Sequence, residues 1–193
     1  MKGKESIIIK FLIEHKNEEL NILKISKALK MDYKNVYSII KRLEKTSLVK
    51  IETFWQSSRV KFNAIVHPLV FEAEFERRKE ILKDKNLAVM LSNFTRGIKS
   101  KTYILLLFGS YAKKTQAKGS DIDLMFICAD GLEDAFEKNV NRIARSMPLP
   151  LHPLVFSESQ FNEMTNAKES NVGQEALKNN VILYGIEQYY EMV

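Results

Sequence analysis

Hydrophobic and polar positions follow a helical period through the first quarter of the chain. A stretch rich in Ile, Phe and Leu predicts a helix over residues 5–15, and Asn21 is placed to cap a second helix. After a polar turn at residues 30–32, the i, i+3, i+4, i+7 spacing predicts a third helix with a buried stripe made of Val36, Ile39, Ile40 and Leu43. Three short helices are therefore expected before residue 48.

Two runs with a period of two come next, over residues 48–54 and 59–66, and predict a pair of strands joined around residues 56–58. A helical pattern returns over residues 69–83, with residues 77–79 expected to face solvent. Further helices are predicted over 85–98, 133–147, 174–179 and 186–192, and strands over 103–108, 122–128, 149–156 and 181–184. This order predicts an α+β fold, in which a helical part with a ribbon of strands precedes a mixed β-sheet flanked by helices.

The most informative polar residues are two aspartates at the start of a predicted strand, Asp121 and Asp123. Side chains at i and i+2 of a strand point to the same face, so the two carboxylates are expected to lie side by side. Like charges that close repel each other unless a cation lies between them, and two carboxylates suit Mg²⁺ or Mn²⁺. Upstream, Gly109 permits a close backbone approach at the end of another apolar run, and the amides after it attract anions. The segment predicts a metal site beside a phosphate cradle.

This ordered set resembles the signature of the minimal nucleotidyltransferases, which belong to the superfamily of DNA polymerase β. Seven residues fall in register with that signature: Gly109, Ser110, Ala112, Ser120, Asp121, Asp123 and Leu124. The resemblance implies a nucleotidyltransferase domain that uses a nucleoside triphosphate with Mg²⁺ or Mn²⁺. It assigns catalysis and metal binding to Asp121 and Asp123, and nucleotide binding to Gly109, Ser110, Lys113, Lys114 and Ser120.

The chain departs from this family in two places. Members that transfer nucleotides carry a third carboxylate on the next strand, whereas strand 149–156 has His152 and no Asp or Glu, and Glu158 lies just past it. His152 is suited to act as a base or a Mn²⁺ ligand, and the more ordinary interpretation is that it packs beside Pro153. Lys114 stands where the family usually has glycine, either as a triphosphate contact or as a solvated charge.

Positive charge is concentrated at one end of the chain. The net charge is +6, and residues 1–66 carry fourteen Lys and Arg against seven Asp and Glu, which leaves −1 for the rest. Such asymmetry indicates a polyanion partner for the N-terminal third. The apolar runs are too short to span a membrane, and the single cysteine, Cys128, is expected to fill the core of a cytoplasmic protein.

Three helices followed by a ribbon of two strands resemble the winged helix-turn-helix of transcription regulators; a small helical domain with a solvated basic face is the alternative. The resemblance implies binding of double-stranded DNA and assigns the contacts to Lys34, Asn35, Tyr37, Ser38, Lys41, Arg42, Arg59 and Lys61. Trp55, near the tip of the ribbon, has a DNA contact and a packing role as alternatives. The expected organisation is a winged helix-turn-helix domain over residues 1–66, a linker helix over 67–85 and a nucleotidyltransferase-like domain over 86–193.

Two functions are compatible with these features. In the first, a DNA-binding protein transfers a nucleotidyl group to a hydroxyl of a small molecule, a nucleic-acid end or a partner protein. In the second, the protein is a non-catalytic transcriptional regulator whose nucleotidyltransferase-like domain senses a nucleotide or forms a dimer. A homodimer paired through the linker helix is a further hypothesis.

Overall fold

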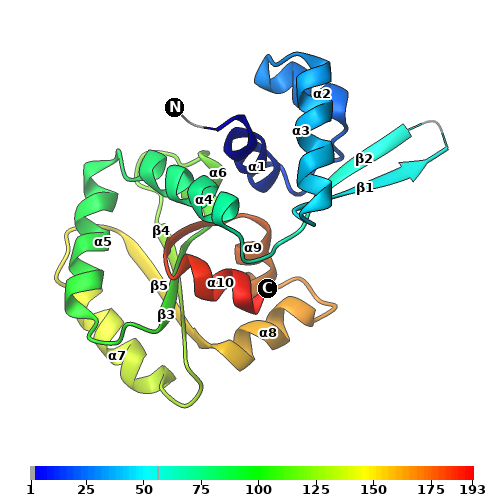
Figure 1. The fold of residues 1–193 in the computed structure, drawn as a ribbon. Helices are drawn as coiled ribbons and strands as arrows, with labels where there is room; N and C mark the ends of the chain where they lie inside the picture. The colour runs from blue at the N-terminus through cyan, green and yellow to red at the C-terminus, as the bar shows by residue number, and fades with distance from the viewer. Residues whose placement is uncertain (1–2, 56) are drawn as a thin grey trace. The chain divides into compact units, whose positions relative to one another are not determined.

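The computed structural model describes residues 3–55 and 57–193 and divides the chain into two compact units (Figure 1). One unit is Met1–Glu76 and the other Arg77–Met192. Each unit has its own sheet, one of two strands and one of four. No helix in the described ranges has the length and apolarity needed to cross a membrane.

The first unit consists of three helices followed by a β-hairpin. Its elements are α1 (Lys4–Glu14), α2 (Ile22–Leu29), α3 (Tyr33–Lys45), β1 (Val49–Phe54) and β2 (Ser57–Phe62). The Asn21 side chain caps α2 by accepting a hydrogen bond from the Lys24 backbone N–H, and Asp32 caps α3 in the same way through Asn35. The predicted stripe of α3 is buried, so tertiary packing follows the helical period read from the sequence.

The hairpin differs from its predicted second strand. β2 spans Ser57–Phe62 rather than residues 59–66, and it pairs antiparallel with β1 from Val49↔Phe62 to Phe54↔Ser57. The apolar residues after Phe62 continue the strand-like pattern, but β1 extends no further back than Val49, so they have no partner on this strand. Of the predicted connection, residue 56 lies outside the described residues.

The predicted linker helix is α4 (Pro68–Ile81). Of the three residues near its last turn that were expected to face solvent, Lys79 is exposed, whereas Arg77 and Arg78 are not. Arg77 is buried, and its guanidinium donates a hydrogen bond to the Asn180 carbonyl. Arg78 donates to the Leu183 carbonyl at 3.2 Å. Because both acceptors flank or belong to the strand at Val181–Tyr184, this turn of α4 is part of the second unit.

The second unit is built around a mixed sheet with the strand order β5-β4-β3-β6. β3 is antiparallel to both β4 and β6, whereas β4 and β5 are parallel, which confirms the predicted mixed sheet. Its elements are α5 (Lys85–Gly97), β3 (Tyr103–Leu107), α6 (Gly109–Lys113), β4 (Ile122–Cys128), α7 (Glu133–Ala144), β5 (Leu151–Ser157), α8 (Glu158–Asn166), α9 (Val172–Lys178), β6 (Val181–Tyr184) and α10 (Ile186–Met192).

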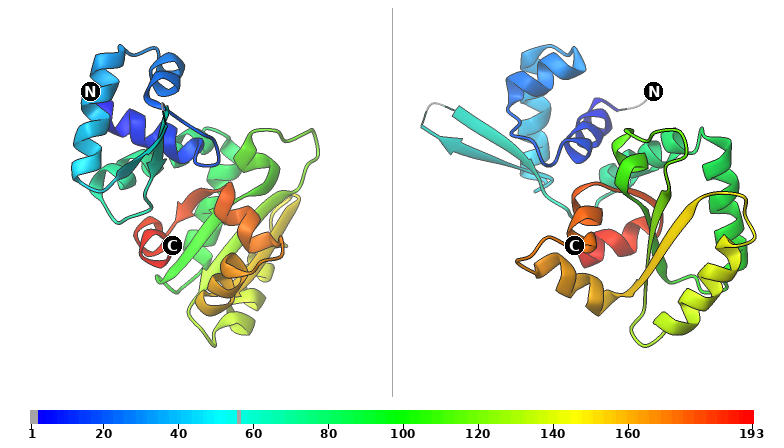
Figure 2. Two further views of the ribbon diagram at one scale, coloured as in Figure 1. Left: turned by 90° about the vertical axis from the view of Figure 1, so that its right-hand side faces the viewer. Right: turned by 180° about the vertical axis from the view of Figure 1, so that it is seen from behind.

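The two faces of this sheet differ, because one is packed against helices and the other carries the Asp123 side chain. Helices α5 and α7 cover one face (Figures 1 and 2), where the rings of Phe94 and Phe126 meet edge to face at 5.0 Å. Cys128 fills this core as predicted, and burial raises the pKa of its thiol to about 11, so the thiol stays protonated. Since Ile122 and Leu124 point to the same core, the strand period turns Asp123 to the opposite face.

Candidate functional site

A glycine turn brings the end of β3 against the start of β4. The backbone of Gly109 has a φ of +64°, a left-handed conformation that glycine adopts without strain. A Cβ atom at this position would lie 3.0 Å from Asp123 Cγ and closer still to Asp123 Oδ2. The Phe108 N–H also donates to the Asp123 carbonyl at 3.1 Å, which ties the turn to the strand. Only a residue without a side chain lets the Asp123 carboxylate lie against this turn.

The two predicted aspartates stand at the same edge of the sheet. Asp123 is the second residue of β4, and the exposed Asp121 immediately precedes this strand. No cation pairs with Asp121 among the residues that the structure describes. Magnesium in phosphate-handling sites is held by one or two carboxylates together with phosphate oxygens, and this pair offers such a donor set. In the described part of the chain, no group of three or more His, Cys, Asp and Glu side chains is arranged to hold a metal ion.

His152 occupies the place on β5 that faces Asp123. The parallel pairing of β4 and β5 sets Asp123 opposite His152, and His152 Nδ1 lies 3.1 Å from Asp123 Oδ1. The His152 side chain is 59% exposed, so it is a surface group that contacts Asp123 rather than part of the core. Glu158 follows the far end of β5, where Ser157 pairs with Cys128. That end is five residues, or about 16 Å, from Asp123, so His152 is the nearer titratable group of β5.

The residues assigned to nucleotide binding surround the glycine turn but differ in their contacts. Lys113 forms an ion pair with Glu175 of α9, with 2.9 Å between Nζ and Oε1. Lys114 ends α6 in the left-handed conformation, with φ of +57°, which explains why a glycine is common at this place in the family. Ser120 stabilises the turn before the aspartates, because its hydroxyl accepts a hydrogen bond from the Ala117 N–H at 2.9 Å. Ser110 lies in the first turn of α6.

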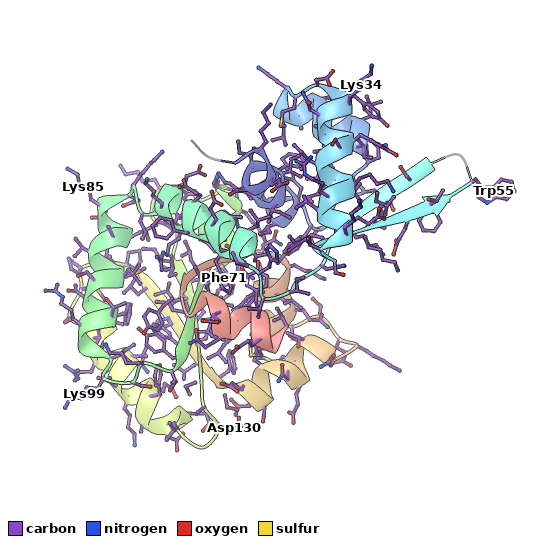
Figure 3. The ribbon with its side chains drawn as sticks, viewed as in Figure 1. Lys34, Trp55, Phe71, Lys85, Lys99 and Asp130 are labelled. Atoms are coloured by element: carbon purple, nitrogen blue, oxygen red, sulfur yellow. The ribbon has the colours of Figure 1, made fainter. Side chains whose placement is uncertain are left out.

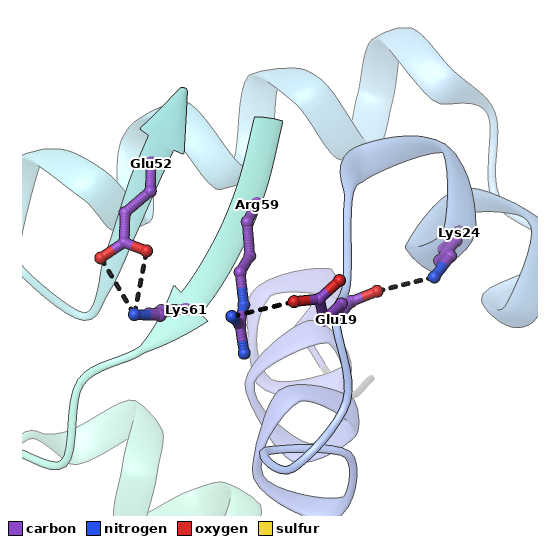
Figure 4. Close-up of polar contacts among 5 residues, drawn as sticks. All are labelled: Glu19, Lys24, Glu52, Arg59 and Lys61. Atoms are coloured by element: carbon purple, nitrogen blue, oxygen red, sulfur yellow. Dashed lines mark hydrogen bonds and ion pairs between the residues drawn. The ribbon is translucent and has the colours of Figure 1, made fainter. Parts of the chain in front are cut away.

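Most of the cations assigned to DNA binding have acidic partners in the first unit. Lys41 pairs with Glu44 and Arg42 with Glu5, both at 2.9 Å. On the hairpin, Lys61 pairs with Glu52 and Arg59 with Glu19 (Figure 4). The Lys61 ammonium holds the pKa of Glu52 below its usual value, and the Glu44 carboxylate raises the pKa of Lys41.

These pairs lie at the surface, where an ion pair contributes only about 0–1 kcal/mol, so a phosphate can replace the carboxylate at little cost. The remaining assigned residues, Lys34, Asn35, Tyr37 and Ser38, are exposed on α3. The Tyr37 ring stacks on the ring of Tyr33, with centroids 6.4 Å apart. The sequence did not reveal the acidic partners of the two arginines, because Glu5 and Glu19 lie 37 and 40 residues from Arg42 and Arg59.

A mixed sheet with a glycine turn after β3 and two aspartates at the start of β4 is the arrangement of a nucleotidyltransferase-type domain. The sequence model of the family described as "Polymerase beta, Nucleotidyltransferase" matches residues 91–189, slightly more than half of the chain, and the chain belongs to this family.

Among solved structures, the chain is similar to one described as "Crystal structure of the toxin-antitoxin with AMP-PNP". The identity is 23% and the TM-score 0.38, over 53% of this chain and 76% of that one. No curated protein matches the chain.

Proposed function

We propose that the second unit binds a nucleoside triphosphate with Mg²⁺ or Mn²⁺ and transfers the nucleotidyl group to a hydroxyl acceptor, while the first unit binds double-stranded DNA. In this proposal residues 1–66 are the winged helix-turn-helix, 67–85 the linker and 86–193 the nucleotidyltransferase domain. The observation that carries the enzymatic part is the contact of Gly109 with Asp123. The backbone at Gly109 leaves no room for a side chain, and it sets the Asp123 carboxylate against a turn that can receive phosphate oxygens.

Each residue of this site has a role in the proposal. Asp121 and Asp123 hold the metal ion, which when bound polarises the phosphate and neutralises charge. Gly109 and Ser110 receive the triphosphate, Lys113 and Lys114 balance its negative charge, and Ser120 positions the segment that carries the aspartates. The acceptor hydroxyl attacks the α-phosphorus, the bond to the bridging oxygen breaks, and pyrophosphate leaves. His152 is the group of β5 that is placed to take the hydroxyl proton, since its imidazole reaches Asp123.

The test uses the purified full chain with each α-labelled nucleoside triphosphate in turn, in the presence of Mg²⁺ or Mn²⁺. We expect pyrophosphate release and transfer of label to an added acceptor, or to the protein itself, with at least one nucleotide. The acceptor panel includes nucleotides, nucleic-acid ends and proteins, because a hydroxyl of any of these satisfies the proposed reaction. If no pyrophosphate is released and no label is transferred with any nucleotide, metal or acceptor, the proposed nucleotidyl transfer is contradicted.

A non-catalytic regulator is the second candidate. The identity of residue 152 favours it, because β5 carries an imidazole opposite Asp123 where transferring members carry a carboxylate. The variant His152→Asp separates the two candidates. A carboxylate at this position is a stronger ligand for Mg²⁺ and a base for the acceptor hydroxyl, so we expect transfer with Mg²⁺ to rise about tenfold or more. His152→Asn is the matched control, because asparagine has the size of aspartate but carries no charge. No pyrophosphate release from the wild type or from either variant would favour the regulator.

Lys114→Gly is expected to separate nucleotide binding from stability. Glycine relieves the left-handed strain at this position, so the free energy of unfolding should rise by up to about 1 kcal/mol in denaturant titrations. Loss of the ammonium should weaken triphosphate binding in calorimetry about fivefold. Lys30→Gly is the control, because Lys30 also ends a helix at a positive φ, of +52°, in the first unit. Equal triphosphate affinity in both variants would leave Lys114 as a solvated charge.

The proposed DNA binding rests on the charge of residues 1–66 and on the exposed polar face of α3. We expect Lys41→Ala/Arg42→Ala to weaken binding of duplex DNA and to lower the slope of log K against log salt by about 2, because two phosphate contacts are lost. Fluorescence anisotropy with labelled DNA measures both quantities. Lys99→Ala/Arg145→Ala removes the same charge from exposed positions of the second unit. If this control changes the slope equally, α3 is not the contact surface.

The homodimer of the proposal is paired through the linker helix. Light scattering at micromolar concentration tests it, and a monomeric mass would exclude it.

A further inference from the structure

The end of the β1–β2 hairpin presents two neighbouring aromatic side chains to solvent. Trp55 is fully exposed, with a relative accessible area of 102%, and Phe54 is 54% exposed. Figure 3 shows the Trp55 side chain extending outward beyond the end of the hairpin. The packing alternative for Trp55 is therefore excluded within the described residues. Neighbouring exposed aromatic residues mark an interaction site when they form a patch with a partner of suitable chemistry.

The backbone of Trp55 indicates that the ring itself matters. Trp55 has a φ of +50°, and bulky residues rarely adopt this left-handed conformation. Glycine and asparagine are the usual residues at such positions of a hairpin turn. A bulky residue in this strained conformation at an exposed turn indicates a functional role for its ring, because neither packing nor backbone geometry favours it there.

Charge identifies the kind of partner. Residues 1–66 carry seven more cations than anions, which suits a polyanion. On the hairpin itself, Lys50 and Lys61 share the single carboxylate of Glu52, and Arg59 pairs with Glu19, so the hairpin keeps a positive charge beside the exposed ring of Trp55. A polyanion that also offers flat apolar rings is a nucleic acid.

We propose that Trp55, assisted by Phe54, contacts nucleobases when the first unit binds double-stranded DNA. The inference rests on the proposed DNA binding and adds a second mode of contact to it. Apolar side chains insert between base steps of duplexes, and aromatic rings stack on bases of any sequence. In this proposal α3 contacts phosphates, and the binding free energy of these contacts depends on the salt concentration. The hairpin end contacts bases, and the binding free energy of that contact does not depend on salt.

The chain offers a direct probe of this contact, because Trp55 is the only tryptophan among its 193 residues. Intrinsic tryptophan fluorescence of the full chain therefore reports on the hairpin end alone. We expect a short DNA duplex to quench this emission and to protect Trp55 from acrylamide. Heparin, a polyanion without bases, should bind the same basic surface and leave the emission unchanged.

Variants at position 55 then distinguish the effect of the aromatic ring on DNA affinity from the effect of the backbone conformation on stability. Trp55→Gly removes the ring and relieves the positive φ, so the variant should be at least as stable as the wild type while its affinity for duplex DNA falls about tenfold or more. The slope of log K against log salt should not change, in contrast to Lys41→Ala/Arg42→Ala. Trp55→Phe should recover most of the affinity. Leu23→Ala is the control, because Leu23 is a half-exposed apolar residue elsewhere in the first unit.

Four results would overturn the inference. If Trp55→Gly binds duplex DNA as tightly as the wild type, the hairpin end makes no contact, although the proposed DNA binding stands. If heparin quenches as strongly as DNA, the effect comes from charge rather than bases. If Trp55 of the free protein becomes protected from acrylamide as protein concentration rises, the hairpin end binds a second copy of the chain. If the wild type binds no DNA at all, the proposed DNA binding and this inference fail together.

Discussion

Replacing both aspartates, in the variant Asp121→Asn/Asp123→Asn, is expected to reduce nucleotidyl transfer about 1000-fold or more while the chain stays folded. Asparagine has the size of aspartate but carries no negative charge, so the variant loses the charge that holds a divalent cation and keeps the shape of the strand edge. Removing one electrostatic contact from a site of this kind costs about 100- to 1000-fold in rate, and this variant removes two. A 1000-fold loss corresponds to about 4 kcal/mol of transition-state stabilisation.

Two measurements check this expectation. Pyrophosphate release gives the rate, and electron paramagnetic resonance of Mn²⁺ gives the bound fraction of metal without requiring turnover. Asp134→Asn/Glu137→Gln is the control, because it removes the same charge from two exposed positions of α7. If both double variants lose Mn²⁺ equally, the paired aspartates are not the metal site. If the variant without the aspartates retains the wild-type rate, catalysis resides elsewhere.

Elements bounded by strong local signals could be predicted from the sequence. The strands Ile122–Cys128 and Val181–Tyr184 and the helix Ile186–Met192 have the predicted bounds. Each follows a charged or turn-forming residue and carries a mostly apolar or a helical pattern. The second strand of the hairpin could not be delimited in this way, because its end depends on where the pairing with β1 stops.

The candidate site was predictable where its parts are close in sequence and not where they are brought together by the fold. The spacing from Gly109 to the aspartates is a property of one segment. The distance from His152 to Asp123 depends on the parallel register of β4 and β5, and no local pattern specifies that register. The ion pair of Lys113 with Glu175 likewise joins residues that are 62 positions apart. Partners of surface cations are therefore the part of a site that sequence patterns predict least well.

Gly109→Ala is expected to destabilise the second unit by about 2–5 kcal/mol and to abolish nucleotide-dependent metal binding. Two separate effects add up here. Alanine in the left-handed conformation costs about 1–2 kcal/mol, and its methyl group must displace the Asp123 carboxylate, an overpacking effect of about 1–3 kcal/mol. Because the displaced group is a proposed metal ligand, the loss of stability and the loss of binding have one cause.

Gly119→Ala is the control that lacks the displacement of a carboxylate. Gly119 also has a positive φ, of +87°, but a Cβ there would meet no atom within 4 Å, so this variant carries the backbone cost alone. Denaturant unfolding should therefore show a smaller loss for Gly119→Ala than for Gly109→Ala. Mn²⁺ binding in the presence of a non-hydrolysable nucleoside triphosphate should persist in Gly119→Ala only. Equal destabilisation and equal Mn²⁺ binding in the two variants would mean that the glycine turn does not position Asp123, and the enzymatic proposal would lose the observation that carries it.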